Sequence, residues 1–456
     1  MMLTLENALL LDIVLGFPFG ISWFPEIGET DALNIDHAPE TFLLKGEQLA
    51  AIKAMLTRGN NMANLILEGL QSEADCLLKI KNPSVTQKPI VPKGISPNDY
   101  YSLALYWWPN TKSPGGLPYI RRDGKVNPVY YSNLYDAVRL RDFTEATFLL
   151  SLAAYITGKD IYAKKASSLI ETWLLEPETR QTPHFFHAQK IPGINKLRYH
   201  GIIEARRLIY VCEAIQLLHC INAITNRFYN QCVKWFVELL HWLEYSEHGQ
   251  KAKSAKNNIG FWYDLQRVIY ARFCKQNHLA ENVIRDFVLQ RIDEQIDEEG
   301  KLPHELLRAK PYDYVAFTLL ALSGIIAASR HGEIQLPEHA TDEGRSFENA
   351  FTWFSETIKK NNLQTAGTFL SQLIISQKQI SELKAENKAY KSSMQNASSK
   401  NFENKNEFQR LIAKLHNVEK ECDRLRSELS NNYLLFFNAA IRYRGLEYLL
   451  KQAQQH

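Results

Sequence analysis

The helical fold expected for this chain is decided by residues 256–264, which read KNNIGFWYD. This stretch lies between two segments of helical periodicity and begins the second of them. Asparagine is favoured at the start of a helix, because its side-chain oxygen accepts a hydrogen bond from a free backbone N–H. The stretch therefore predicts a helix that begins near residue 258 and continues to about residue 275.

The same periodicity extends in both directions along the chain. Apolar residues recur every three or four positions through residues 40–82 and again from about residue 134, as in helices that bury one face. Short connections favour antiparallel helix pairs. No run of alternating β-branched residues predicts a strand, so the expected fold class is all-α. The predicted helices after residue 134 cover residues 137–157, 160–174, 199–222, 228–245, 258–275, 279–295 and 313–331.

Three regions of different character suggest a domain organisation. Residues 1–39 are predicted to be an N-terminal apolar arm, and residues 40–345 the helical domain. Inside that domain, residues 83–133 are rich in Pro, Gly and Asn, and a loop of this length usually carries function. Residues 346–456 form the predicted helical tail. Within it, apolar residues alternate at spacings of three and four over 376–430, which indicates coiled-coil segments.

Composition and charge narrow the classes of function. The chain has 456 residues, of which 45% are hydrophobic and 23% charged, as is ordinary for a globular protein. Its formal net charge is +3 and it has no long basic run, so nucleic acid is not a predicted partner. Six cysteines occur without a C-x-x-C pair, which argues against a zinc ribbon or a redox motif.

Five motifs follow one another along residues 99–314. They read DYYSLALYWWP (99–109), PYIRRDG (118–124), AQKIPG (188–193) followed by GIIEAR (201–206), NNIGFWYD (257–264) and ELLRAKPYDY (305–314). In this order they resemble the alginate-lyase family of polysaccharide lyases. The resemblance covers residues from about 40 to 330. It implies an incomplete (α/α) toroid of antiparallel helix hairpins and a substrate that is an acidic, uronate-containing polysaccharide.

Elimination next to a uronate makes three chemical demands. The carboxylate on C5 must be neutralised, a base must take the C5 proton, and an acid must protonate the leaving oxygen O4. The resemblance assigns Tyr314 as acid and base, and Arg308 and Asn258 to the carboxylate. A tyrosine suits this work if a neighbouring cation lowers its pKa from about 10. From the residues alone, the alternatives are that Tyr314 packs as an aromatic in the core, that Arg308 forms a surface ion pair and that Asn258 caps a helix.

Two family positions are changed in this chain. Ile259 stands where the family has a histidine, and Leu105 replaces a proline. The resemblance implies that this histidine helps to neutralise the carboxylate and serves as base on the face opposite the tyrosine. The isoleucine side chain can neither form a hydrogen bond nor exchange a proton. Activity is therefore expected to be weaker, or restricted to syn eliminations of mannuronate-type units, for which Tyr314 does both jobs.

Further side chains in and near the motifs are predicted to bind the glycan. Aromatic rings suit stacking on sugars and arginines suit carboxylates, while core packing, solvation and helix capping are the alternatives for each. His187 and His200 are the candidates to replace the missing histidine. The full set is Tyr106, Trp107, Trp108, Arg121, Arg122, His187, Gln189, His200, Asn257, Trp262 and Tyr263.

No cofactor or metal is predicted, because His184 and His187 have no third ligand at a suggestive spacing. The alternative to a lyase is a weak or inactive relative that binds an acidic glycan and is tethered to a partner through its tail. The tail at 376–430 is the predicted site of self-association or protein binding.

The compartment stays open. Residues 7–24 are apolar but lack a basic start and contain Asp12, Pro18 and Gly20, so they indicate neither a clear signal peptide nor a membrane span. The resemblance implies a periplasmic or secreted protein, and the lack of a clear signal leaves the cytoplasm as the alternative.

Overall fold

The computed structural model describes residues 38–47, 49, 50, 53, 54, 61–334, 336 and 339–360. Residues 1–37 of the predicted arm and the whole predicted coiled coil at 376–430 lie outside the described residues. The domain boundaries at residues 39 and 345 stay predictions.

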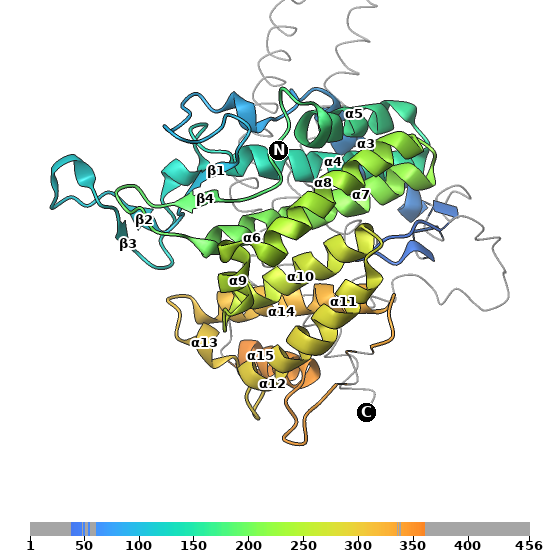
Figure 1. Ribbon diagram of the computed structural model, residues 1–456. Coiled ribbons are helices and arrows are strands. Elements are labelled where there is room, and N and C mark those ends of the chain that lie inside the picture. The colour runs from blue at the N-terminus through green and yellow to red at the C-terminus, as the bar shows by residue number, and fades with distance from the viewer. Residues whose placement is uncertain are drawn as a thin grey trace, which may run out of the picture.

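Helices make up most of the described chain, which confirms the all-α prediction (Figure 1). Several begin or end within two residues of their predicted limits, and the helix predicted at 137–157 has those bounds. The helices are α3 (Asn61–Leu78), α4 (Ala137–Thr157), α5 (Asp160–Ile170), α6 (Ile202–Ala205), α7 (Ile209–Cys220), α8 (Asn226–Tyr245), α9 (Glu247–Lys253), α10 (Asn258–Phe273), α11 (Asn277–Val283), α12 (Leu289–Gln295), α13 (Pro303–Leu306), α14 (Pro311–Ser329) and α15 (Phe347–Lys360).

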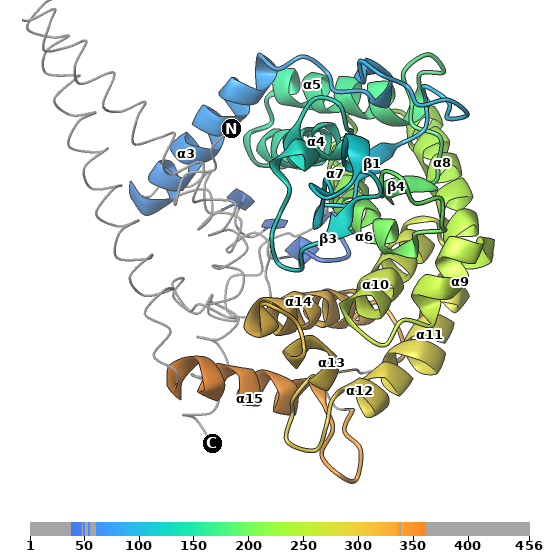
Figure 2. The same ribbon diagram turned by 90° about the vertical axis from the view of Figure 1, so that its left-hand side faces the viewer.

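The helices pack as successive pairs around an open ring, the incomplete (α/α) toroid (Figure 2). Helix α4 packs against α5 and α7, and α10 packs against α8, α11 and α14. Figure 2 shows α4, α7, α10 and α14 lying inside an outer row that includes α5, α8 and α11. Helix α15 packs on α14, so helical structure continues beyond residue 345.

Four short strands were not predicted from the sequence. Strand β1 (Tyr101–Leu103), in the segment expected to be a loop, pairs in parallel with β4 (His187–Lys190), which lies outside that segment. Strands β2 (Trp107–Trp108) and β3 (Ile120–Arg121) pair antiparallel in a lobe that projects from the helical body in Figure 1. Strands of two to four residues are too short to show an alternating pattern. Their pairing places the first three motifs side by side.

Helix α10 lies at the centre of the toroid, and all of its residues are buried. Most of the motif at 257–264 fixes this helix in place. Trp262 Nε1 donates to the Phe317 carbonyl at 3.1 Å, and the Tyr263 hydroxyl donates to the Leu243 carbonyl at 2.8 Å. These two side chains, which were predicted to bind substrate, are packed in the core.

The Arg291 side chain from α12 passes close to Gly260 and donates a hydrogen bond to Asp264. Arg291 Nε donates to Asp264 Oδ2 at 2.5 Å, and its Nη1 donates to the Ala255 carbonyl at 2.7 Å. A Cβ atom at Gly260 would lie 2.4 Å from Arg291 Nη1. The glycine is therefore required so that the guanidinium can cross α10.

Helix α14 is mostly buried, like any core helix. Of the described helices, α14 has the length and apolar composition of a membrane span, but 61% of its apolar 18-residue stretch is buried inside the protein. A buried core helix passes the same test, so this finding carries no membrane assignment.

Candidate functional site

The tyrosine and arginine singled out by the ELLRAKPYDY motif lie against each other at the corner between α13 and α14. The guanidinium carbon of Arg308 lies 3.6 Å from the ring centroid of Tyr314, a close cation–π contact. The Tyr314 hydroxyl donates to the hydroxyl of Tyr106, or accepts from it, at 2.9 Å. The fold thus brings together three predicted site residues from motifs about 200 positions apart in sequence.

The pKa of Tyr314 is raised, whereas the sequence suggested that a cation would lower it. Burial is the largest cause, the hydrogen bond and charge of Tyr106 add to it, and Arg308 opposes it. The Tyr314 hydroxyl is therefore protonated in the free protein at neutral pH. It is ready to act as an acid, and it needs added positive charge or the loss of the Tyr106 contact before it can act as a base.

Asp123, which the sequence reading did not single out, completes this corner. Its carboxylate accepts from Arg308 Nε at 3.2 Å and Nη2 at 3.0 Å, and from Arg121 Nη2 at 2.8 Å. Burial opposes its ionisation, but the hydrogen bonds from Arg308 and Arg121 lower the pKa of Asp123 to about 2. The only signal in the sequence was its place in the R-D-G part of its motif.

Asn257 and Asn258 have different tasks. Asn257 Oδ1 accepts from the Ile259 N–H at 3.1 Å and caps α10, which was the structural alternative for this residue. Asn258 Nδ2 donates to both carboxylate oxygens of Glu305 at 3.0 Å each. Burial raises the pKa of Glu305, and hydrogen bonds from Asn258 oppose that rise. Glu305 is a second residue of the corner that the sequence reading missed.

Ile259 contributes no polar group. The residue is 6% exposed and belongs to the hydrophobic core.

His200, one of the two predicted replacement histidines, is affected by the charge of Arg308 at the corner. It precedes α6, and its Nδ1 is buried with no hydrogen-bond partner. Burial, together with the charges of Arg198, Arg121 and Arg308, lowers the pKa of His200 to about 4. The imidazole is therefore neutral at neutral pH. A bound carboxylate would oppose these cations and favour its protonation.

Two arginines contact the rings of Trp107 and Trp108. The guanidinium of Arg198 lies 5.7 Å from the Trp107 ring centroid, and that of Arg122 lies 5.3 Å from the Trp108 ring. Burial and the charge of Arg121 lower the pKa of Arg198 to about 10, so the guanidinium remains charged. Such a surface, rich in positive charge and aromatic rings, suits a polyanionic sugar chain.

Gln189 lies in a buried polar network that joins β1, β4 and α6. Its φ angle is +52°, a strained conformation for this residue type, and its N–H donates to Ser102 Oγ at 2.8 Å. Glu204 accepts hydrogen bonds from Tyr100 at 2.7 Å, Ser102 at 2.6 Å and Tyr130 at 3.1 Å. These bonds fix the strands that carry the lobe.

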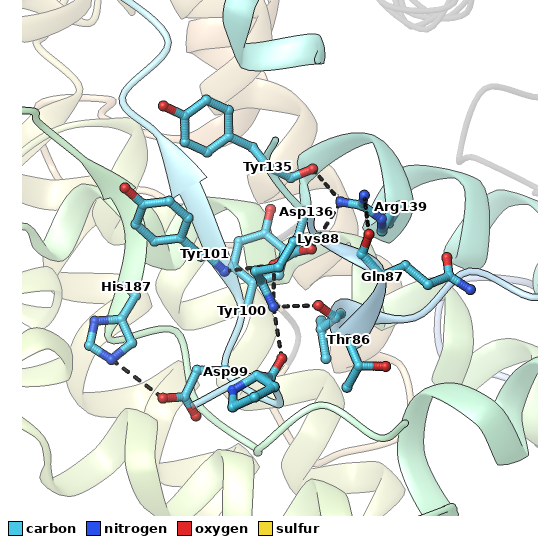
Figure 3. A network of polar contacts seen from close by, with 12 residues as sticks. Thr86, Gln87, Lys88, Asp99, Tyr100, Tyr101, Tyr135, Asp136, Arg139 and His187 are labelled. Carbon is cyan, nitrogen blue, oxygen red and sulfur yellow. Dashed lines mark hydrogen bonds and ion pairs between the residues drawn. The ribbon is translucent and has the colours of Figure 1, made fainter. Parts of the chain in front are cut away.

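His187 lies in another polar cluster, shown in Figure 3. Its Nε2 is 3.5 Å from Asp99 Oδ2, and His184 Nε2 is 3.2 Å from Asp99 Oδ1. Beside it, the buried Lys88 amine lies 3.2 Å from Asp136. None of the described contacts joins His187 to Tyr314. Across the described residues, no three His, Cys, Asp or Glu side chains are grouped so that they could hold a metal ion.

The burial of His248 predicts that the protein loses stability in acid. It packs on Phe186 and Trp242, and neither of its ring nitrogens has a partner. Burial, with the charge of Lys190 next, lowers the pKa of His248 to about 4. In the unfolded chain this histidine has a pKa of about 6.5. Between the folded and unfolded pKa values, the unfolded chain therefore binds more protons than the folded one. Stability is full above this window and is lost as the pH falls through it.

We expect His248→Gln to reduce this loss by roughly 1–2 kcal/mol between pH 7 and pH 5. The measurement is the free energy of unfolding in urea at both pH values. His241→Gln, at an exposed position on α8, is the control. Equal pH dependence of the parent and His248→Gln would contradict the prediction.

Comparison with known proteins adds independent findings. The family model described as alginate lyase matches residues 84–364. The crystal structure of an alginate lyase from Bacteroides ovatus is similar over 70% of this chain and 84% of its own, with 31% sequence identity and a TM-score of 0.67. Alginate lyase A1-III from Sphingomonas species A1 matches over 65% of this chain and 78% of its own, with 16% identity and a TM-score of 0.42. No curated protein matches the chain.

Proposed function

Because this chain belongs to the alginate-lyase family, we propose that it cleaves a uronate-containing, alginate-like polysaccharide by β-elimination at Tyr314. The observation that supports this site is the position of Tyr314, with the Arg308 guanidinium on its ring face and Tyr106 at its hydroxyl. An acid–base group held between a cation and a second hydroxyl is suited to moving a proton to and from one point.

The proposed reaction requires that the Tyr314 hydroxyl, which is protonated in the free protein, first gives its proton to solvent. The ionised oxygen then takes the C5 proton of the uronate. The electrons of the C5–H bond form the C4–C5 double bond, and the C4–O4 bond breaks. The same tyrosine then returns its proton to O4. The products are an unsaturated uronate at one new end and a free hydroxyl at the other.

The carboxylate next to C5 must carry part of the negative charge that develops. Arg308 and Arg121 both donate to Asp123, and their charges and that of Arg198 act on His200. In the described contacts Arg308 uses Nε and Nη2 for Asp123, which leaves Nη1 to meet the substrate. We assign carboxylate binding to these arginines, because the Nδ2 group of Asn258 already donates to Glu305.

The stereochemistry of the substrate follows from Ile259. Because this position has no titratable group, we assign both the removal of the C5 proton and the protonation of O4 to Tyr314, which requires both on the same face of the sugar. Mannuronate has this arrangement, and glucuronate has the same configuration at C4 and C5. Guluronate, inverted at C5, places them on opposite faces. We therefore propose mannuronate- or glucuronate-type polymers as the substrate.

The test is a set of initial rates followed by the ultraviolet absorbance of the unsaturated product. Polymannuronate or a glucuronan should be cleaved faster than polyguluronate, and a neutral mannan, which has no carboxylate on C5, should not react. Absence of product from every uronate polymer would contradict the proposed function. In that case binding without turnover would support the less favoured alternative, an inactive relative that holds an acidic glycan.

Self-association through residues 376–430 is a separate proposal. Its support is the alternation of apolar residues at spacings of three and four in that segment. Deleting residues 372–456, which leaves α15 intact, should lower the mass measured by light scattering while the helical circular dichroism of the toroid persists. An unchanged mass would contradict this role.

A further inference from the structure

The lobe formed by residues 104–127, which carries β2 and β3, touches the α13–α14 corner through the turn at Asp123 and Gly124. Asp123 binds Arg308 through two nitrogens, at 3.2 and 3.0 Å, and also accepts from the Ala309 N–H at 3.4 Å. Gly124 has a φ of +72°, and a Cβ there would lie 3.3 Å from Ala309 Cβ. The turn is therefore shaped to lie close against the corner.

The two-point contact fixes the orientation of the Arg308 guanidinium. A carboxylate that accepts from Nε and Nη2 holds the planar group along one edge, and the guanidinium carbon lies 3.6 Å from the Tyr314 ring centroid. The same lobe carries Tyr106, whose hydroxyl lies 2.9 Å from that of Tyr314. One carboxylate thus controls both neighbours of the proposed acid–base group.

We propose that Asp123 is a positioning residue of the elimination reaction, which holds Arg308 flat on Tyr314 and keeps Tyr106 at its hydroxyl by fixing the lobe to the corner. The catalytic part of this inference rests on the proposed function. Asp123 touches no substrate in this role and acts through Arg308. Its negative charge also partly offsets that cation at the Tyr314 ring.

Asp123→Asn should therefore change turnover more than binding. The amide keeps the shape of the side chain but loses the charge and one acceptor, so Arg308 is held less firmly. We expect kcat to fall roughly ten- to a hundred-fold, as for a displaced catalytic group, with KM changed less than about three-fold. Asp123→Glu, which keeps the charge, should recover part of the loss. Asp142→Asn, which removes a surface partner of Arg141, is the matched control.

A pH profile separates positioning from simple structural damage. The charged and titratable groups that act on Tyr314 are Tyr106, Arg308 and Asp123, and Asp123 raises its pKa. Removing this negative charge should shift the rising limb of kcat/KM to lower pH. Asp123→Asn with the parent's kcat and the parent's pH profile would overturn the proposal.

Hydrogen exchange on the full chain tests the contact without any turnover. Peptides covering residues 104–127 and 309–316 should exchange faster in Asp123→Asn than in the parent or in Asp142→Asn, while α4 and α10 keep their protection. If the parent cleaves no uronate polymer, the proposed function fails, and this exchange alone decides whether Asp123 holds the lobe. Unchanged exchange in these two segments would overturn the inference.

Discussion

Tyr314→Phe should reduce the rate of elimination by about 10²–10⁴-fold and leave the affinity for the glycan nearly unchanged. The substitution removes one oxygen atom and keeps the ring that lies under Arg308. Only the group that moves protons between C5 and O4 is lost. The measurements are kcat on a defined oligouronate, and Kd for the same oligosaccharide by calorimetry.

The control for this variant is Tyr245→Phe, at a tyrosine that is 73% exposed at the end of α8. It should keep the parent's rate. If Tyr314→Phe also keeps that rate, the assignment of the acid–base group is wrong even if the chain is a lyase. If the affinity falls together with the rate, Tyr314 binds the substrate in its ground state and is not the proton carrier alone.

Asp264→Ala should lower the free energy of unfolding by about 3–5 kcal/mol, the largest stability effect we expect from a single substitution. Asp264 is fully buried on α10. It accepts from Arg291 Nε at 2.5 Å and lies 3.4 Å from Arg267 Nη1. Its removal leaves the buried Arg291 guanidinium with backbone carbonyls as its other partners.

Urea denaturation of Asp264→Ala, of Arg291→Met and of the double variant measures this effect. The double variant should be more stable than Asp264→Ala, because it no longer buries an uncompensated cation. Asp142→Asn, in a surface ion pair, should change stability by less than about 1 kcal/mol. A loss below that value for Asp264→Ala would show that water or rearranged carbonyls replace the carboxylate.

The helical framework could be predicted because its signal is local. The helical spacing of apolar residues over 228–245 and the asparagine before residue 258 each lie within one helix, and α8 and α10 begin within two residues of the predicted starts. The short strands could not be predicted in this way. Strand β1 exists because Tyr101 lies beside His187, a residue far along the chain, and three residues carry no period of their own.

The candidate site shows the same division. The motifs pointed to Tyr314, Arg308 and Asn258 as a group. The opposite pKa direction of Tyr314 and the roles of Asp123 and Glu305 were missed. Each depends on burial or on a partner from another motif, as with Asp123 and Arg308.

The sequence by itself determined the helices, the family and the identity of the chemical groups. Tertiary structure alone decided which members of each motif reach the corner and which hold the core. In the NNIGFWYD stretch most residues hold the core: Asn257 caps α10, Asp264 accepts from Arg291, and Trp262 and Tyr263 donate to distant carbonyls. Asn258 is the member of the stretch that donates to Glu305 at the corner. The physical reason is that periodicity records which face of a helix is apolar, whereas the direction of each polar side chain is set by partners that only folding brings within hydrogen-bond distance.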